Sequence, residues 1–310
     1  MTPTSDPRAL RRDTLVDTVD HVIQHSVELD GLQRTFTVIG APTAPAARPL
    51  VLVFHGSRQD GESHRRFTHD ALLPLATSGE AVVAYLDGYR GHWNDARRES
   101  SFAARRRGVD DVAFARMVVD RLEASHGIDP ARVVTVGYSN GGQMVFRLLH
   151  EAPELVSAAV IIAAAMPAPE SFLASPSAPA ARPTPIALVH GTRDPIVPFE
   201  GGTMRWWARR LFRVGGRSLS ALETAAYLAA RNGLDGPPEV TPLEAAASSD
   251  GRTTVIRTRY STPDIPSVTL YEVRGGGHTV PGLRPSPRMV GRTTADVTLA
   301  DLVAEAVSLA

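Results

Sequence analysis

Cysteine is absent from the 310 residues of the chain, which excludes disulfides, thiolate metal ligands and a cysteine nucleophile. Lysine is absent as well, so all 33 basic residues are arginine, and they balance 33 acidic residues. A net charge of zero gives no electrostatic reason to expect binding to nucleic acid or to an anionic membrane. No run approaches the roughly 20 apolar residues that a membrane-spanning helix needs. What is left is a globular chain long enough to bury a large core.

The N-terminal part of the chain is charged and has no apolar segment of the kind found in a signal peptide. We therefore expect a cytoplasmic enzyme, although a secreted protein whose leader had been removed would look the same. Residues 1–28 are expected to form an N-terminal arm that need not be fully ordered, and residues 29–310 to form one catalytic domain. The sequence does not indicate an oligomeric state.

Strand and helix patterns alternate along the chain. Continuous apolar runs predict buried strands at 49–54, 81–86, 133–136, 158–164 and 186–190. A strongly periodic stretch predicts a helix at 109–126, and helical composition predicts further helices at 62–76, 143–150, 200–232 and 295–309. The remaining patterns predict an antiparallel edge strand at 33–39, a turn at 128–130 and a β pair at 253–259 and 267–273. This order predicts an α/β fold with a mostly parallel sheet and helices on both faces.

The most informative stretch is V-V-T-V-G-Y-S-N-G-G, residues 133–142. It places Ser139 in a G-x-S-x-G motif between a β-branched run and a stretch of helical composition. Glycines two residues on either side allow the strand and the helix to pass without a Cβ clash, so the turn lifts the serine hydroxyl above the sheet. The pattern therefore predicts a nucleophilic serine; the alternative is a tight turn with an incidental serine.

A serine nucleophile needs a base to remove its proton and an acid to orient that base. Asp194 follows the strand predicted at 186–190, and His278 lies in a glycine-rich loop after the strand predicted at 267–273. The order Ser, Asp, His is the one expected of an α/β-hydrolase. Taken singly, Asp194 is also explained as a turn former and His278 as a structural loop residue.

The tetrahedral intermediate needs two backbone N–H donors for its oxyanion. The residue after the nucleophile and the loop after the strand that ends in H-G predict Asn140 and Ser57, with Arg58 as the neighbouring option. His55 is interpreted as a residue that fixes this loop. The other histidines show no metal-ligand spacing, so no metal site is predicted.

Four side chains near these motifs are candidates for binding the substrate: Arg58, Trp93, Asn94 and Tyr138. Trp93 lies in the long polar loop 87–107, where it would either stack on a sugar or aromatic acyl group or pack beneath the loop. Trp206 and Trp207, with Leu211 and Phe212, would form either a lid over the pocket or a buried amphipathic face, and the second is the simpler interpretation.

The motifs together resemble the α/β-hydrolase esterases that include poly(3-hydroxybutyrate) depolymerases and feruloyl or acetyl xylan esterases. The resemblance is carried by F-H-G-S-R-Q-D-G (54–61), Y-L-D-G-Y-R-G-H-W-N-D (85–95), V-D-D-V-A-F (109–114), G-I-D-P-A-R-V-V-T-V-G-Y-S-N-G-G (127–142), H-G-T-R-D-P-I-V-P-F-E-G-G (190–202), A-A-R-N-G (229–233) and G-G-G-H-T-V-P-G (275–282). It implies a catalytic triad of Ser139, Asp194 and His278, with neither a metal nor an organic cofactor.

The chain departs from this family's pattern in two ways. Many relatives carry a disulfide-forming cysteine after the H-G pair, where this chain has Ser57. Secreted polymer-degrading members also tend to carry a signal peptide and a polymer-binding module, and neither is recognisable here, which weakens the case for an insoluble polymer. The expected activity is that of a serine carboxylesterase acting on a small or oligomeric ester: 3-hydroxyalkanoate oligomers, feruloyl or acetyl esters, or small aliphatic esters. A serine peptidase and a non-catalytic binding protein of the same fold are the alternatives.

Overall fold

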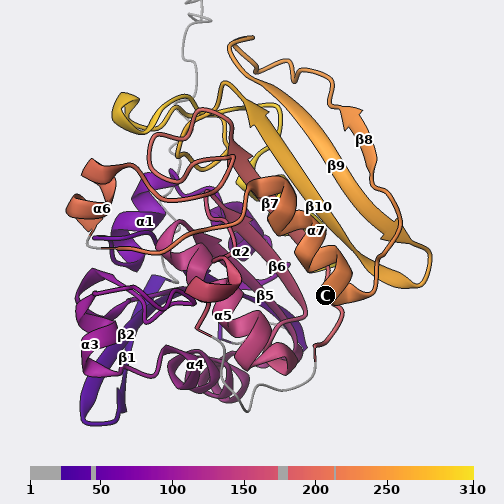
Figure 1. Ribbon diagram of the computed structural model, residues 1–310. Helices are drawn as coiled ribbons and strands as arrows, with labels where there is room; N and C mark the ends of the chain where they lie inside the picture. Colours follow the sequence, from indigo (N-terminus) through magenta and orange to yellow (C-terminus); the bar gives the residue numbers. More distant parts are fainter. Residues whose placement is uncertain (1–21, 43–46, 174–180, 213) are drawn as a thin grey trace, which may run out of the picture.

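The computed structural model describes residues 22–42, 47–173, 181–212 and 214–310, and its centre is a ten-stranded sheet between two layers of helices (Figure 1). The spatial order of the strands is β1-β2-β4-β3-β5-β6-β7-β10-β9-β8. The six strands from β4 to β10 in this order are parallel, and antiparallel pairs flank them on both sides. The strands are β1 (Val22–Leu29), β2 (Leu32–Ile39), β3 (Arg48–Phe54), β4 (Val82–Leu86), β5 (Ile128–Tyr138), β6 (Ala158–Ile162), β7 (Ile186–Gly191), β8 (Glu239–Pro242), β9 (Thr254–Thr262) and β10 (Ile265–Arg274).

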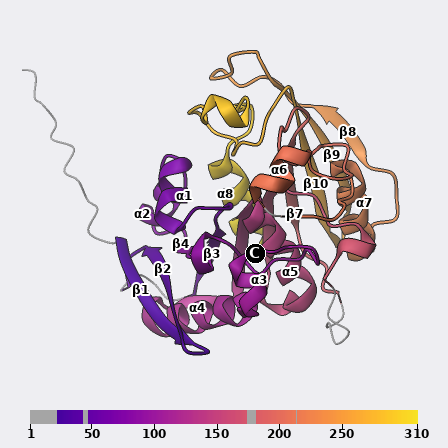
Figure 2. The same ribbon diagram turned by 60° about the vertical axis from the view of Figure 1, so that its left-hand side comes forward.

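The helices cover both faces of the sheet, as a second view makes clear (Figure 2). They are α1 (Gly61–Phe67), α2 (Leu73–Thr77), α3 (Ala103–Arg107), α4 (Asp111–His126), α5 (Asn140–Glu151), α6 (Trp206–Phe212), α7 (Ala221–Asn232) and α8 (Leu299–Leu309), with short 3-10 turns η1 (Tyr89–Gly91), η2 (Pro153–Leu155), η3 (Pro169–Ser171) and η4 (Arg288–Val290). Alternate side chains of β3 face opposite ways: Leu50 and Leu52 pack with α4, α5 and α7, whereas Val51 and Val53 pack with α2 and α8. Such two-sided burial explains why the central strands are apolar throughout rather than alternating.

The predicted fold class is confirmed, because the core of the sheet is parallel and its helices lie on both faces. The predictions at the N-terminal end need correction. Residues 22–28, assigned to the arm, form most of β1, which pairs with β2 along its whole length. That pairing places β2 inside the sheet rather than at its edge. Residues 1–21 of the arm lie outside the described residues.

Three local predictions also differ from the structure. The helix expected at 62–76 is two helices, because His69 and Asp70 adopt positive φ angles of 54° and 57° between them. The turn expected at 128–130 is the first part of β5, where Ile128 pairs with Arg48. The helix expected at 200–232 is two helices, α6 and α7, separated by an irregular segment.

Within the described ranges, no helix combines the length and the apolar character required to span a bilayer.

Candidate active site

Ser139 occupies the sharp turn between β5 and α5, as the G-x-S-x-G motif predicts. Its φ and ψ angles are 53° and −111°, a conformation that a non-glycine residue adopts only when its surroundings enforce it. A Cβ at Gly141 would collide with the carbonyl oxygen of Phe54, and one at Gly137 would collide with the backbone of Gly141 itself. Both glycines are therefore required by close backbone approach, and the turn presents the Ser139 hydroxyl at the carboxyl end of the sheet.

The structure brings Ser139, His278 and Asp194 together in one hydrogen-bonded chain. Nε2 of His278 lies 2.9 Å from Oγ of Ser139, and Nδ1 of the same ring lies 2.7 Å from Oδ2 of Asp194. The imidazole and the carboxylate are buried, whereas Ser139 is only half-buried. When the Nδ1–H of His278 donates its hydrogen bond to the carboxylate, Nε2 carries no proton and can accept the proton of the serine hydroxyl. A serine nucleophile needs this arrangement.

Asp194 is held in place by its own turn. Its Oδ1 accepts hydrogen bonds from the backbone N–H groups of Ile196 at 2.7 Å and Val197 at 2.8 Å. Burial alone would raise the pKa of Asp194, but the nearby His278 imidazole, its hydrogen bond and the Ile196 amide together hold that pKa below its ordinary value. The carboxylate is therefore charged at neutral pH and can stabilise a protonated imidazole.

Tyr138 supports the loop of the histidine rather than the substrate, for which it was a candidate. Its hydroxyl donates a hydrogen bond of 2.8 Å to the backbone carbonyl of His278, and its ring centroid lies 5.2 Å from the imidazole. The Tyr138 side chain is buried and is absent from the lining of the pocket beside Ser139. The tyrosine therefore positions the base.

Two backbone N–H groups next to the nucleophile are available for an oxyanion. Those of Ser57 and Asn140 make no hydrogen bond within the described part of the chain, whereas the N–H of Arg58 donates to the carbonyl of Gly91 at 2.8 Å. This removes Arg58 as the alternative donor. The assignment of Ser57 and Asn140 to the oxyanion hole stays a prediction, now with the competing residue excluded.

Trp93 and Asn94 are structural residues, so their candidacy as substrate contacts is wrong. Trp93 is fully buried, and its indole Nε1 donates to the carbonyl of His55 at 2.9 Å. Asn94 is also buried, and its side-chain amide donates to the carbonyl of Val109 at 2.7 Å. The side chain of Asn140 anchors the same loop, because it accepts from the Trp93 N–H at 3.0 Å and donates to Asp95 at 2.5 Å.

His55 fixes the loop that carries Ser57, as interpreted from the sequence. Its Nδ1 lies 2.7 Å from the carbonyl of Gly56, and its Nε2 accepts from the N–H of Gly88 at 2.9 Å. Burial lowers the pKa of His55 to about 4, so the ring is neutral at physiological pH. Among the described residues, no three histidine or carboxylate side chains are grouped so that they could hold a metal ion.

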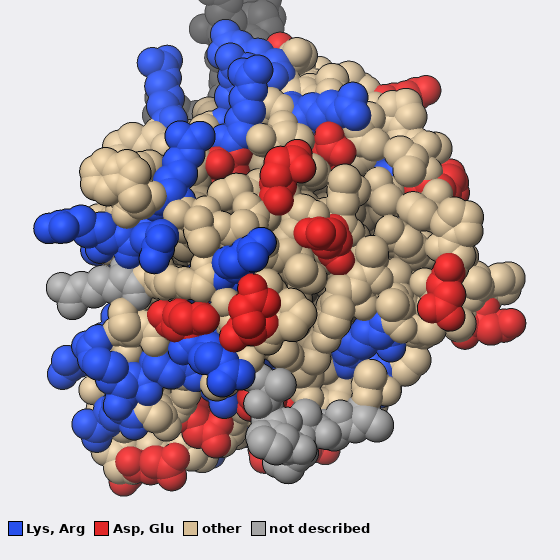
Figure 3. Space-filling model, viewed as in Figure 1, with Lys and Arg blue, Asp and Glu red and all other residues tan. Residues whose placement is uncertain are grey.

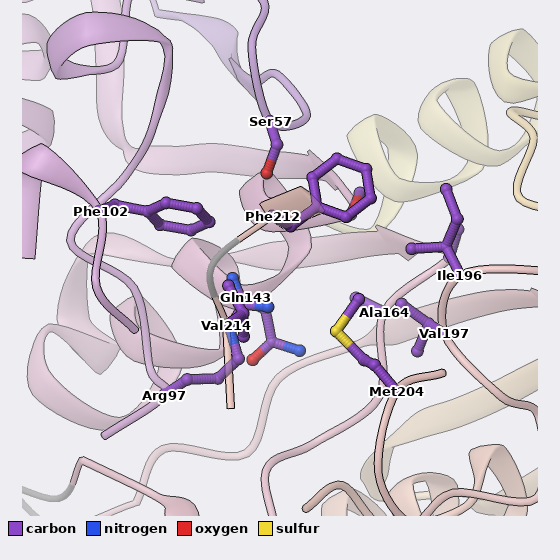
Figure 4. Close-up of a pocket in the computed structure, with 12 residues that line it drawn as sticks. Ser57, Arg97, Phe102, Gln143, Ala164, Ile196, Val197, Met204, Phe212 and Val214 are labelled. Atoms are coloured by element: carbon purple, nitrogen blue, oxygen red, sulfur yellow. The ribbon is translucent and has the colours of Figure 1, made fainter. Parts of the chain in front are cut away.

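A small pocket opens beside Ser139, between the sheet edge and the segment that contains α6 (Figure 4). Its volume is about 20 Å³. Most of the wall is apolar, with Phe102, Met204 and Phe212 as its largest side chains. A space of this size holds a group of one or two heavy atoms, such as a methyl or a hydroxyl.

Two polar side chains in this pocket, Gln143 and Arg97, were not identified from the sequence. Gln143 is buried; its Nε2 donates to the carbonyl of Ala165 at 2.7 Å, and its Oε1 has no hydrogen-bond partner among the described residues. Arg97 forms an ion pair with buried Asp95 and lines the same pocket, toward which both side chains reach in Figure 4. Gln143 could have been identified from its position four residues after Ser139, because that spacing places it one helical turn further along α5. No pattern pointed to Arg97.

α6 lies beside the pocket and contributes Phe212 to its wall, but neither of its tryptophans. Phe212 lines the pocket, whereas Trp206 is 78% exposed and Trp207 is 37% exposed. The buried amphipathic face favoured from the sequence is therefore wrong for Trp206. For Phe212, which lines the pocket, the lid interpretation stays a prediction.

Comparison with known proteins finds esterases among the relatives of this chain. A family model described as phospholipase/carboxylesterase matches residues 87–206. NocK of Nocardia uniformis subsp. tsuyamanensis, to which an esterase function is ascribed, is 31% identical over 271 residues, which cover 84% of this chain and 74% of NocK. Feruloyl esterase B of Piromyces equi is 28% identical over 163 residues, which cover 52% of this chain and 28% of that protein.

A solved structure matches over nearly the whole chain. The acetyl xylan esterase from Aspergillus awamori aligns with a TM-score of 0.61 at 14% identity, covering 93% of this chain and 100% of that one. At this identity the likeness shows a shared fold.

Proposed function

The chain belongs to the esterases of the α/β-hydrolase fold, and we propose that it hydrolyses carboxylic esters through a covalent acyl-enzyme formed on Ser139. The observation that supports this most directly is the unbroken chain of hydrogen bonds from Ser139 Oγ through the His278 ring to Asp194. Each atom in that chain has the partner that nucleophilic catalysis requires.

In the first half-reaction, Ser139 Oγ attacks the ester carbonyl carbon while Nε2 of His278 takes the hydroxyl proton. The carbonyl oxygen becomes negatively charged, and the N–H groups of Ser57 and Asn140 stabilise it. The intermediate then collapses: the bond to the alcohol oxygen breaks, that oxygen takes the proton from Nε2, and the acyl group stays on Ser139. Asp194 stabilises the imidazolium throughout.

In the second half-reaction, water replaces the alcohol. Nε2 of His278 takes one proton from the water as its oxygen attacks the acyl carbon, and the same two N–H groups again stabilise the oxyanion. Collapse breaks the bond to Ser139 Oγ, which recovers the proton from Nε2, and the carboxylic acid leaves. No step requires an oxidant, a reductant or a second substrate other than water.

The lining of the small pocket supports a short acyl group that carries a hydroxyl. Its volume of about 20 Å³ holds one or two heavy atoms, such as the hydroxyl end of a short acyl chain, whereas an aromatic ring would require α6 to shift. The unpartnered Oε1 of Gln143 can accept a hydrogen bond from a hydroxyl, and the guanidinium of Arg97 can donate one to it. Within the polyhydroxybutyrate depolymerase and feruloyl esterase type, these features favour a 3-hydroxyacyl ester over a feruloyl ester.

Active-site labelling with kinetics tests the mechanism. We expect a fluorophosphonate to add its phosphonyl mass to the peptide that contains Ser139, and Ser139→Ala to lower kcat/KM for 4-nitrophenyl acetate by at least about 10³-fold. Ser308→Ala, on the exposed side of α8, is the matched control and should react like the wild type. Labelling at another residue, or near-normal turnover by Ser139→Ala, would rule out the proposed mechanism.

A further inference from the structure

A second, larger cavity adjoins the pocket of Ser139. Its volume is about 250 Å³, and it lies between the loop after β3, the η1 turn, the start of α3 and the end of α6. Phe102 and Phe212 line both this cavity and the small pocket, so the two spaces are neighbours that share these side chains as walls. A substrate whose acyl group occupies the small pocket therefore has room for its alcohol part in the larger cavity.

The larger cavity is strongly basic. Arg58, Arg90 and Arg106 line it, and none of them forms an ion pair with a carboxylate in the ranges that the structure describes. We refer to it as the basic cavity. On the surface drawn in Figure 3, arginines gather along the side where α3 and α6 lie. The protein as a whole carries no net charge, so this concentration of one sign is a local feature.

The contacts of these three arginines hold them in the wall without neutralising them. Arg58 donates to the carbonyl of Leu211 at 2.9 Å, and Arg106 donates to the carbonyl of Ser101. The guanidinium of Arg90 lies 5.5 Å from the centroid of the Tyr89 ring. Each arginine retains N–H groups beyond those contacts, because a guanidinium has five.

The groups around the cavity do not compensate its charge. His92 also lines the wall, and burial, followed by the charge of Arg58, lowers its pKa, so the ring is neutral at physiological pH. Asp95, the buried carboxylate whose charge acts on His92, is already paired with Arg97 and lies close to Arg105. The basic cavity therefore presents about three positive charges to whatever enters it.

We propose that the basic cavity binds an anionic group, a carboxylate or a phosphate, on the alcohol part of the ester that Ser139 cleaves. The proposal rests on the proposed function, because that function places the ester bond at Ser139. The preference for an anion follows separately from the arginines that line the basic cavity. Guanidinium groups suit both anions because their planar N–H pairs match two oxygens at once. The enzyme thus selects an ester by its leaving group as well as by its acyl group.

A matched set of acetyl esters tests this. We would compare 4-acetoxybenzoate with its neutral methyl ester, and add 4-acetoxyphenyl phosphate to separate a carboxylate preference from a phosphate preference. The acetyl group fits the small pocket in all three. We expect kcat/KM for one of the anionic esters to exceed that for the methyl ester by about tenfold at low salt, mainly through KM, and the ratio to fall as salt screens the arginines.

Arginine variants test whether the preference for anionic esters comes from the basic cavity. Arg90→Gln and Arg106→Gln should each lower the ratio of anionic to neutral kcat/KM about three- to fivefold, and the double variant should bring it close to one. Arg98→Gln, which removes the same charge from an exposed residue outside the cavity wall, is the control and should leave the ratio unchanged. A ratio near one in the wild type, or one that survives the double variant, would overturn the proposal.

A binding measurement separates this inference from the mechanism. Calorimetric titration of Ser139→Ala with 4-hydroxybenzoate and with 4-hydroxyphenyl phosphate, against methyl 4-hydroxybenzoate, needs no catalysis. Tighter binding of one of the anions that the double arginine variant loses would support the basic cavity even if Ser139 proved not to be the nucleophile. Equal binding of all three compounds would refute it whatever the outcome for Ser139.

Discussion

The hydroxyl of Tyr138 donates a hydrogen bond of 2.8 Å to the backbone carbonyl of His278, so the residue immediately before Ser139 carries the loop of the imidazole that faces Ser139. Two hydrogen bonds therefore connect the turn of the nucleophile to the loop of the base. One joins the side chains of Ser139 and His278, and the other joins the Tyr138 hydroxyl to the His278 carbonyl. We expect the spacing between Oγ of Ser139 and Nε2 of His278 to depend on the buried hydrogen bond of Tyr138.

Tyr138→Phe should separate positioning from stability. Losing one buried hydrogen bond costs about 1 kcal/mol of unfolding free energy, and a less constrained His278 should lower kcat severalfold with little change in KM. Kinetics and urea unfolding measure the two effects. Tyr227→Phe is the control, because its hydroxyl contacts His150 on the outer side of the protein at 2.9 Å. An unchanged kcat in Tyr138→Phe would show that the hydrogen bond is only structural.

Gly141→Ala should prevent correct folding of the turn. Its Cβ would meet the carbonyl oxygen of Phe54, and neither backbone can yield without displacing β3 or α5. We expect a loss of more than about 3 kcal/mol in unfolding free energy together with loss of esterase activity. Gly236→Ala makes the same change in open space and should unfold like the wild type in the same urea titration. A stable, active Gly141→Ala would contradict this description of the turn.

Asp111→Ala should be among the most damaging changes of a charged residue. Asp111 is buried and accepts from Arg34 at 2.7 Å and from the Asn94 N–H at 2.7 Å. Its removal leaves the buried guanidinium of Arg34 without its charged partner, which costs roughly 3–5 kcal/mol. Glu154→Ala removes an acid from an exposed ion pair with Arg116 and should cost under about 1 kcal/mol. Comparable losses in the two variants, measured by chemical unfolding, would count against a special role for the buried pair.

Sequence patterns predicted those features that depend on local chemistry. Ser139, Asp194 and His278 were found because each follows a strand in a turn of recognisable composition, and the structure brings all three within hydrogen-bond distance. The helix predicted at 109–126 was found from its regular apolar spacing and the helix predicted at 143–150 from its composition, and they correspond to α4 and α5.

The sequence predictions were wrong where the environment of a residue is set by contacts with residues far away in the sequence. β1 was missed because its side chains are mostly half-buried or exposed, so its strand character comes from pairing with β2 rather than from an apolar run. Trp93 was a candidate substrate contact because its loop lies at the site, yet its environment is set by His55, 38 positions away in sequence. The basic cavity collects arginines from three segments, and no single stretch contains its pattern.

The folded protein should lose stability between pH 6.5 and 4 partly through His55. Burial lowers its pKa from 6.5 to about 4, so in this window the unfolded chain binds a proton that the folded protein does not. The unfolding free energy is thus unaffected by His55 above pH 6.5 and falls as the pH drops toward 4, by roughly 3 kcal/mol in total. Urea unfolding at pH 7.5, 6.0 and 4.5 should show a shallower pH dependence in His55→Gln, and an identical slope in both proteins would argue against this assignment.

The last prediction concerns the unpartnered oxygen in the small pocket. A buried acceptor without a donor is costly, so Oε1 of Gln143 is better satisfied when the acyl group brings a hydroxyl than when it brings only methylene groups. We therefore expect wild-type kcat/KM to be higher for 4-nitrophenyl 3-hydroxybutyrate than for 4-nitrophenyl butyrate.

Gln143→Met should reduce or reverse that preference, because methionine has a similar length and offers no strong acceptor. A site built to bond a hydroxyl discriminates against its absence, and we expect the ratio of the two kcat/KM values to fall about five- to tenfold. Gln33→Met, on the exposed side of β2, is the control for the substitution itself. If the ratio is the same in Gln143→Met and the wild type, the oxygen bonds only water, and acyl selection must then come from the apolar walls formed by Met204 and Phe212.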